Sequence, residues 1–164
     1  MEDEATLSFL RKQAADGAYI LSVCTGALVC GAAGLLQGVR ATTHWSALHL
    51  LPYFGAISVD ERVVVDGRMI SAGGVTAGID GALRAAAILR GERTAQVIQL
   101  MMQYAPQPPW DCGQPGRAPA DVLDIALRVT RELTARREET ARRVTGSGKT
   151  PALPAALPSS QTSG

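Results

Sequence analysis

The chain has 164 residues, 46% of them hydrophobic and 19% charged, which are the proportions of a single globular domain. Its formal net charge is +1, so bulk electrostatics gives no reason to expect nucleic acid or anionic lipid as a partner. Three cysteines, an odd number, argue against a secreted disulfide framework. The acidic start at residues 2–4 lacks the basic region of a signal peptide. We therefore expect a cytoplasmic protein.

Apolar periodicity and turn residues predict the elements of the chain in order. They are a helix over 4–15, a strand over 19–23, a helix from 25 towards the glycines at 34 and 38, a strand over 40–43, one or two helical turns over 45–51, strands over 61–66 and 68–71, helices over 78–90 and 92–104, a proline-rich loop over 105–118 and a last helix from Pro119. Asp66-Gly67 between two strand-like runs is a strong hairpin signal. Strands that alternate with helices predict a parallel α/β sheet.

The last helix carries an apolar face, composed of Val122, Ile125, Ala126, Val129 and Leu133. Its later part is rich in arginine, but glutamates offset the charge, so we interpret it as a solvated surface rather than a nucleic-acid reader. Residues 145–164 are mostly Pro, Ser, Thr, Gly and Ala, a composition that favours disorder. We expect one α/β domain over 1–144 and a disordered tail over 145–164. Met101 and Met102 lie on an apolar helix, which predicts core positions.

Residues 17–39 contain no charge, which admits two interpretations. About 20 apolar residues are enough for a membrane span, but no basic cluster and no aromatic belt flank this segment. The alternative is a buried strand that turns sharply at Cys24 into a helix, with Gly26 allowing close passage of the backbone. The unpaired amides at the start of that helix would favour a thiolate and a developing anion. An inert core cysteine stays open as a third interpretation.

Four separated motifs follow one another along the chain: SVCTGALVCGAAGLL, ATTHW, ERVVVDGRMISAGGVTAGID and YAPQPPWDCGQP. Together they resemble the ThiJ/PfpI family of the class I glutamine-amidotransferase-like superfamily, and within it the isonitrile hydratase type most. The resemblance covers roughly residues 5–120. It implies a three-layer, flavodoxin-like α/β sheet with Cys24 at a nucleophile elbow.

The resemblance also implies an activity and roles for individual residues. Cys24 matches the nucleophile, Thr25 the residue whose backbone amide helps to bind developing charge, and His44 a histidine near the cysteine. The positions that would border the substrate pocket are Gly26, Gly73, Gly74 and Thr76. The reaction of that type adds water to an isonitrile, a small molecule, and gives an N-substituted formamide. It implies no metal and no organic cofactor, and related members are often homodimers.

The chain departs from the family pattern at its start. Only about twenty residues precede Cys24, and few central strands are predicted where such sheets usually have five or six. We expect the first βαβ units to be missing, through truncation, a wrongly assigned start or a genuine short variant. The upstream carboxylate of the family then has no counterpart, and the chain is expected to be inactive on its own.

Three functional classes therefore stay open. The first is a cysteine enzyme of the isonitrile hydratase type. The second is a ligand-sensing domain related to AraC-type transcription regulators, without their DNA-binding part. The third is a structural remnant without activity. His44 also has a plain alternative, a histidine at the edge of the core that bonds to backbone.

Overall fold

The computed structural model describes residues 1–146, so the predicted tail, apart from Thr145 and Gly146, lies outside the described residues. The elements in chain order are α1 (Glu4–Ala15), β1 (Ile20–Val23), α2 (Gly26–Ala32), β2 (Arg40–Ala41), the 3₁₀ helix η1 (Trp45–Phe54), β3 (Ile57–Ser58), β4 (Val63–Asp66), β5 (Met69–Ala72), α3 (Ala77–Arg90), α4 (Glu92–Met101) and α5 (Ala120–Thr145). The alternation of strands and helices confirms the predicted α/β class.

The main sheet has three strands in the order β1-β5-β4. β1 and β5 run parallel, with Val23 opposite Ala72. β4 and β5 form the antiparallel hairpin that Asp66-Gly67 predicts, with Asp66 opposite Met69, and Gly67 has the positive φ of 57° that such a turn favours. A second, two-stranded sheet pairs β2 with β3 in parallel. The sequence did not predict β3, which has two residues.

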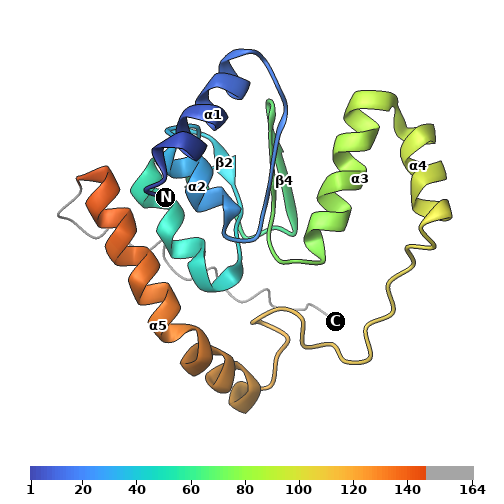
Figure 1. Ribbon diagram of the computed structural model, residues 1–164. Helices are drawn as coiled ribbons and strands as arrows, with labels where there is room; N and C mark the ends of the chain where they lie inside the picture. Colours follow the sequence, from blue (N-terminus) through green and yellow to red (C-terminus); the bar gives the residue numbers. More distant parts are fainter. Residues whose placement is uncertain (147–164) are drawn as a thin grey trace.

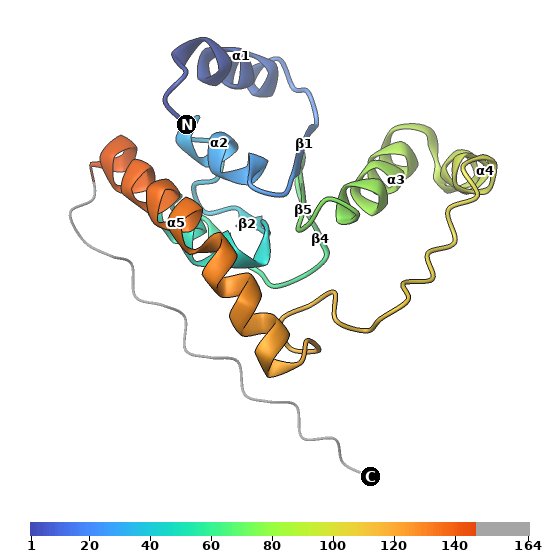
Figure 2. The same ribbon diagram turned by 60° about the horizontal axis from the view of Figure 1, so that its bottom comes forward.

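Helices cover both faces of the main sheet (Figures 1 and 2). α3 packs on β1 and β5 from one side, and α4 packs beyond it on α3. On the other side lie α2 and η1, with α1 against α2 and α5 against η1. The side chains of β1 divide accordingly, because successive residues of a strand point to opposite faces: Leu21 lies near Gly81 of α3, and Ile20 packs against the core under α2. The result is the expected three-layer arrangement.

The main core lies between α2, η1 and the sheet. Leu28, Leu36, Leu50, Leu51 and Phe54 are its large, fully buried members. Gly31 of α2 packs directly on the ring of Phe54, since a β-carbon there would lie 2.5 Å from the ring carbon Cγ. The charge-free segment 17–39 is therefore a strand and a helix of this core. None of the helices in residues 1–146 combines the length and the apolar character that a bilayer crossing requires.

Several predicted elements differ from the structure. The strand over 40–43 ends at Ala41, and the helix over 92–104 ends at Met101. The helical turns over 45–51 continue through Pro52 to Phe54. The assignment of Met101 and Met102 to the core is wrong: their exposed fractions are 83% and 53%. Met101 ends α4, and Met102, directly after it, borders an open apolar cavity beside α3.

The apolar face predicted for the last helix is not the face that packs. Val122, Ile125, Val129 and Leu133 are all exposed. The helix instead contacts η1 along another face, on which Ala141 is fully buried; of the predicted stripe only Ala126 is half-buried. Local periodicity identifies an amphipathic helix, but it does not specify which neighbour covers the apolar stripe.

Candidate active site

Cys24 occupies the sharp turn between β1 and α2. Its φ is 54°, in the left-handed region that residues with a side chain rarely adopt. Its amide still donates a hydrogen bond to the carbonyl oxygen of Ala72 at 2.9 Å, so the turn begins one residue beyond the paired strand. Gly26 then opens α2. A strained residue between a buried strand and a helix is the backbone geometry of a nucleophile elbow.

The ends of three strands bring the predicted site segments to one edge of the sheet. β1 and β5 are parallel neighbours, so Cys24 and Gly73 both follow the last paired residues. β2 is followed by Thr42, whose amide donates to Ser71 Oγ at 2.9 Å, and by Thr43, whose carbonyl oxygen lies beside Gly73. The two contacts advance together along both segments, so β2 and β5 run in the same direction. Ligands of open α/β sheets bind at the carboxyl ends of the strands. The segments that contain Cys24, Thr43 and Gly73 therefore share that edge.

Thr43 makes a direct link to the elbow. Its hydroxyl donates a hydrogen bond to the carbonyl oxygen of Cys24 at 2.8 Å, and only 2% of the residue is exposed. Its own carbonyl oxygen lies 3.5 Å from the position of a β-carbon on Gly73. Thr43 thus contacts both of the other strand ends.

His44 follows Thr43 and begins η1. Its Nδ1 lies 2.8 Å from Ser46 Oγ and accepts a hydrogen bond from the Ser46 amide at 3.3 Å. Burial, and to a smaller extent the positive charge of Arg137, lowers the pKa of His44 below its usual 6.5. A hydrogen bond from backbone to the ring is what the plain alternative for this residue predicts. Within residues 1–146, His44 and the Cys24 thiol do not form a hydrogen bond.

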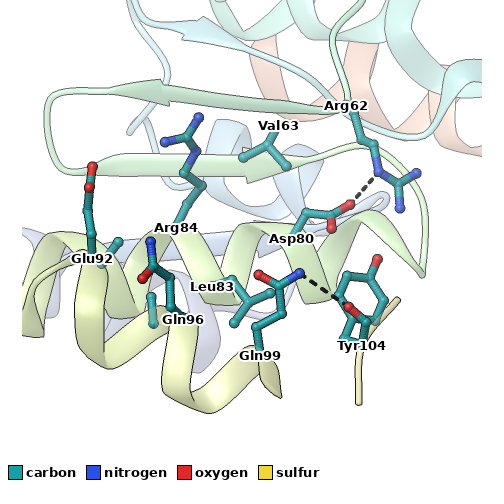
Figure 3. A pocket seen from close by; sticks show the side chains of 11 residues that line it. Arg62, Val63, Asp80, Leu83, Arg84, Glu92, Gln96, Gln99 and Tyr104 are labelled. Carbon is teal, nitrogen blue, oxygen red and sulfur yellow. Dashed lines mark hydrogen bonds and ion pairs between the residues drawn. The ribbon is translucent and has the colours of Figure 1, made fainter. Parts of the chain in front are cut away.

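The loop after β5 is held by Arg62. The amide of Gly73 donates to the carbonyl oxygen of Arg62 at 3.0 Å, and the Arg62 guanidinium reaches Thr76 Oγ1 at 3.3 Å. The same guanidinium pairs with Asp80 of α3 (Figure 3). Asp80 is therefore a structural partner of this loop.

Two of the cavities beside the helices α3 and α4 adjoin segments of the candidate site. One of about 560 Å³ contains the Arg62–Asp80 pair together with Arg84, Glu92 and Tyr104 (Figure 3). The other, of about 470 Å³, is apolar and is lined by Val23, Val75, Gly78, Ile79, Ala82, Leu83, Ala86, Ile98 and Met102. Val23 directly precedes Cys24, and Val75 belongs to the loop at Gly73–Thr76. The apolar cavity thus adjoins two of the site segments.

The three cysteines have different environments. Cys24 is half-buried, and its thiol forms no hydrogen bond within the described part of the chain. Cys30 is buried in the core, and burial raises the pKa of its thiol to about 11. Cys112 is exposed in the proline-rich loop. In residues 1–146 no group of three His, Cys, Asp or Glu side chains is placed to hold a metal ion.

Residues 1–88 match the DJ-1/PfpI family. The chain belongs to this family. It is 59% identical over 128 residues to an isonitrile hydratase from Pseudomonas putida, covering 78% of the chain and 56% of that protein. It superposes on the crystal structure of a ThiJ/PfpI family protein from Pseudomonas syringae with a TM-score of 0.81 and 43% identity, covering 85% of the chain and 57% of that structure.

A more distant match concerns an HTH-type transcriptional regulator from Pseudomonas aeruginosa. It is 34% identical over 102 residues, which is 61% of this chain and 30% of the regulator. The chain thus spans 56% of the hydratase, 57% of the solved structure and 30% of the regulator. The DJ-1/PfpI assignment confirms the resemblance and the flavodoxin-like fold class that the motifs predicted.

Three residues at this edge were not singled out from the sequence. They are Thr43, Ser71 and Arg62, and each acts through a hydrogen bond to backbone or to another side chain. Thr43 lies in the ATTHW motif next to His44, so its position was visible but its partner was not. A bond between residues 19 positions apart depends on the tertiary fold, which no local pattern specifies.

Proposed function

We propose that this chain carries the cysteine part of an isonitrile-hydrating site, with Cys24 as the nucleophile. The observation that carries the proposal is the left-handed backbone of Cys24, held between β1 and α2 in a chain closely similar to an isonitrile hydratase. A cysteine kept at φ 54° without a structural need is expected where the side chain has chemistry to perform.

The reaction divides into two steps, which covalent catalysis by cysteine makes accessible. The Cys24 sulfur attacks the terminal carbon of R–N≡C, and an acid delivers a proton to that carbon, giving the thioimidate R–N=CH–S–Cys24. Water then adds to this carbon while the nitrogen gains a proton. The resulting R–NH–CH(OH)–S–Cys24 releases the thiol and R–NH–CHO. The atoms of one water molecule are thereby taken up and no electrons are transferred.

The residues around Cys24 divide the remaining tasks. Thr25 supplies a backbone amide for developing charge, and Gly26 leaves room beside it. His44 follows Thr43 at the start of η1, at the same edge of the sheet, and Gly73, Gly74 and Thr76 border the substrate. The apolar cavity beside Val23 and Val75 has the chemistry to accept the hydrocarbon substituent R.

The acid that donates the proton is a separate part of the proposal. Within residues 1–146 no carboxylate contacts the Cys24 thiol. We infer that the acid lies on polypeptide other than these residues, so the chain alone hydrates isonitriles slowly or not at all. We also propose a small-molecule substrate, a cytoplasmic location and homodimer formation, the last of which sedimentation analysis tests.

The experiment follows formation of the N-substituted formamide from an aliphatic isonitrile by chromatography. Product formed by the wild-type chain and abolished by Cys24→Ser supports the proposal. Turnover that persists in Cys24→Ser contradicts it. A third sample contains added Pseudomonas putida isonitrile hydratase with serine in place of the cysteine aligned with Cys24, once that variant alone has been shown to form no product. Product that forms only in this mixture places the acid on the added protein.

A ligand-sensing role is the second candidate, because the chain also resembles part of a transcriptional regulator. It predicts that an isonitrile or a related small molecule binds without being converted. Calorimetry that shows saturable binding, together with no formamide under the same conditions, would favour this role.

A further inference from the structure

The carbonyl group of Cys24 points away from the helix that follows it. The Leu28 amide bonds to the carbonyl oxygen of Thr25 at 3.1 Å, so the first helical turn closes on Thr25 and leaves the Cys24 carbonyl out. Its only hydrogen-bond donor among residues 1–146 is the Thr43 hydroxyl at 2.8 Å. A hydrogen bond in a half-buried position stabilises the group that accepts it by about 1 kcal/mol, so this bond favours one orientation of the carbonyl.

A fixed carbonyl also fixes the next amide. The peptide bond is planar and trans, so the N–H of Thr25 points opposite to the C=O of Cys24. Because the carbonyl is directed at Thr43, the Thr25 N–H is directed away from it. That N–H makes no hydrogen bond within the described residues, and it is therefore a free donor at the elbow.

We propose that Thr43 is a positioning residue, whose hydroxyl orients the Cys24–Thr25 peptide so that the Thr25 N–H faces the reacting atoms. This inference rests on the proposed function. The oriented N–H donates to the thiolate before attack and to the water-derived oxygen of R–NH–CH(OH)–S–Cys24 afterwards. Donors that are oriented before charge develops are effective because they need not reorganise during the reaction.

Substitutions at Thr43 separate the hydroxyl from the volume of the side chain. Thr43→Val removes the hydroxyl and keeps the shape, and Thr43→Ser keeps the hydroxyl. With the Pseudomonas putida variant added to supply the acid, we expect Thr43→Val to lower kcat about 10- to 100-fold with KM within about twofold, since the loss falls on charge stabilisation rather than on substrate binding. Thr43→Ser is expected to stay within about threefold of the wild type.

Thr42→Val is the matched control. Thr42 is buried next to Thr43 and bonds through its backbone amide, so loss of its hydroxyl leaves the elbow peptide in place. If Thr42→Val and Thr43→Val lower kcat equally, the effect is one of packing and the proposal is overturned. If Thr43→Val does not fold, Thr43→Ala provides the hydroxyl-free variant.

A spectroscopic readout tests the same inference without any turnover. In protein labelled with carbonyl-¹³C cysteine, Cys24→Ser identifies the Cys24 signal. Loss of a hydrogen bond to a carbonyl oxygen moves its ¹³C resonance upfield, so we expect this shift in Thr43→Val and not in Thr43→Ser or Thr42→Val. An unchanged Cys24 resonance in Thr43→Val would overturn the proposal. A wild-type chain that hydrates no isonitrile even with the added Pseudomonas putida variant, but whose Cys24 resonance shifts in Thr43→Val, would refute the proposed function alone.

Discussion

The amide of Cys24 donates a hydrogen bond to the carbonyl oxygen of Ala72, and this 2.9 Å bond is the last one between β1 and β5. The amide of Cys24 thus belongs to the hydrogen-bonded sheet, whereas its carbonyl group lies beyond the last paired residue. One side is fixed by a strand, and the other by the hydroxyl of Thr43. The thiol is consequently held at the edge where three strand ends meet.

The first prediction concerns the thiol itself. Cys24→Ser is expected to lower isonitrile hydration by about 10³-fold or more, because a serine hydroxyl is a much weaker nucleophile without an activating base. The free energy of unfolding should change little, since the two side chains are similar in size. Formamide production and urea unfolding measured on the same preparation check both statements. Cys112→Ser is the control for loss of a reactive thiol elsewhere.

A second prediction follows from the left-handed backbone at Cys24. Glycine adopts φ 54° without the steric cost that a β-carbon causes, which is about 1–2 kcal/mol. We therefore expect Cys24→Gly to be more stable than Cys24→Ala by about 1 kcal/mol, in spite of the greater entropy of glycine in the unfolded chain. Urea unfolding of both variants measures this difference. Equal stabilities would show that the positive φ is absent in solution.

Much of the fold could be predicted from local signals. The Asp66-Gly67 turn, the short buried strand before Cys24 and the glycine at the end of α3 each specify their own conformation. The face on which α5 packs could not be predicted locally. It depends on Tyr53 of η1, whose hydroxyl donates to Glu138 Oε1 at 2.9 Å across 85 residues. The periodicity of α5 identified a helix and an apolar stripe, and the polar contact with η1 selected another face for packing.

The site divides in the same way. The elbow at Cys24 is a local feature, and its motif identified it. The role of Thr43 is a tertiary feature, which needs β2 to lie beside β5 before its hydroxyl can reach the Cys24 carbonyl. The loop at Gly73–Thr76 was predicted as a border of the pocket, but the contact that fixes it comes from Arg62, between β3 and β4.

A third prediction uses the buried thiol of Cys30. Its pKa is raised to about 11 from 9.0 by burial, so the folded state keeps the proton longer than the unfolded state. The raised pKa therefore contributes at most about 2–3 kcal/mol to the free energy of unfolding. This contribution is fully present below about pH 9 and is lost as the pH rises towards about 11. Urea unfolding over this range should show the loss in the wild type and a smaller loss in Cys30→Ala. Parallel curves for the two proteins would contradict the prediction.

A fourth prediction concerns His44, whose pKa is lowered by burial and then by Arg137. The folded state disfavours the protonated ring, so its contribution to stability is present above pH 6.5 and is lost as the pH falls through the lowered pKa. We expect the free energy of unfolding to fall more steeply between about pH 7 and pH 5 in the wild type than in His44→Gln. His49→Gln serves as the control, and an equal slope in all three proteins would exclude a depressed pKa at His44.

The last prediction tests how closely α3 approaches the strand that carries the cysteine. A β-carbon at Gly78 would lie 2.8 Å from Val23 Cγ1, which is inside the contact distance of two carbon atoms. Gly78→Ala must therefore push α3 away from β1 or rotate Val23, at a cost of about 1–3 kcal/mol in the free energy of unfolding. The favourable helix propensity of alanine offsets at most about 1 kcal/mol of this.

Gly113→Ala provides the matched control, because a β-carbon at Gly113 would meet nothing within 4 Å. It is expected to leave the unfolding midpoint unchanged. Since Val23 directly precedes Cys24, the displacement in Gly78→Ala should also lower the rate at which iodoacetamide alkylates Cys24, followed by peptide mass spectrometry. A variant that is destabilised but keeps the wild-type alkylation rate would show that the elbow is held by Ala72 and Thr43 independently of α3.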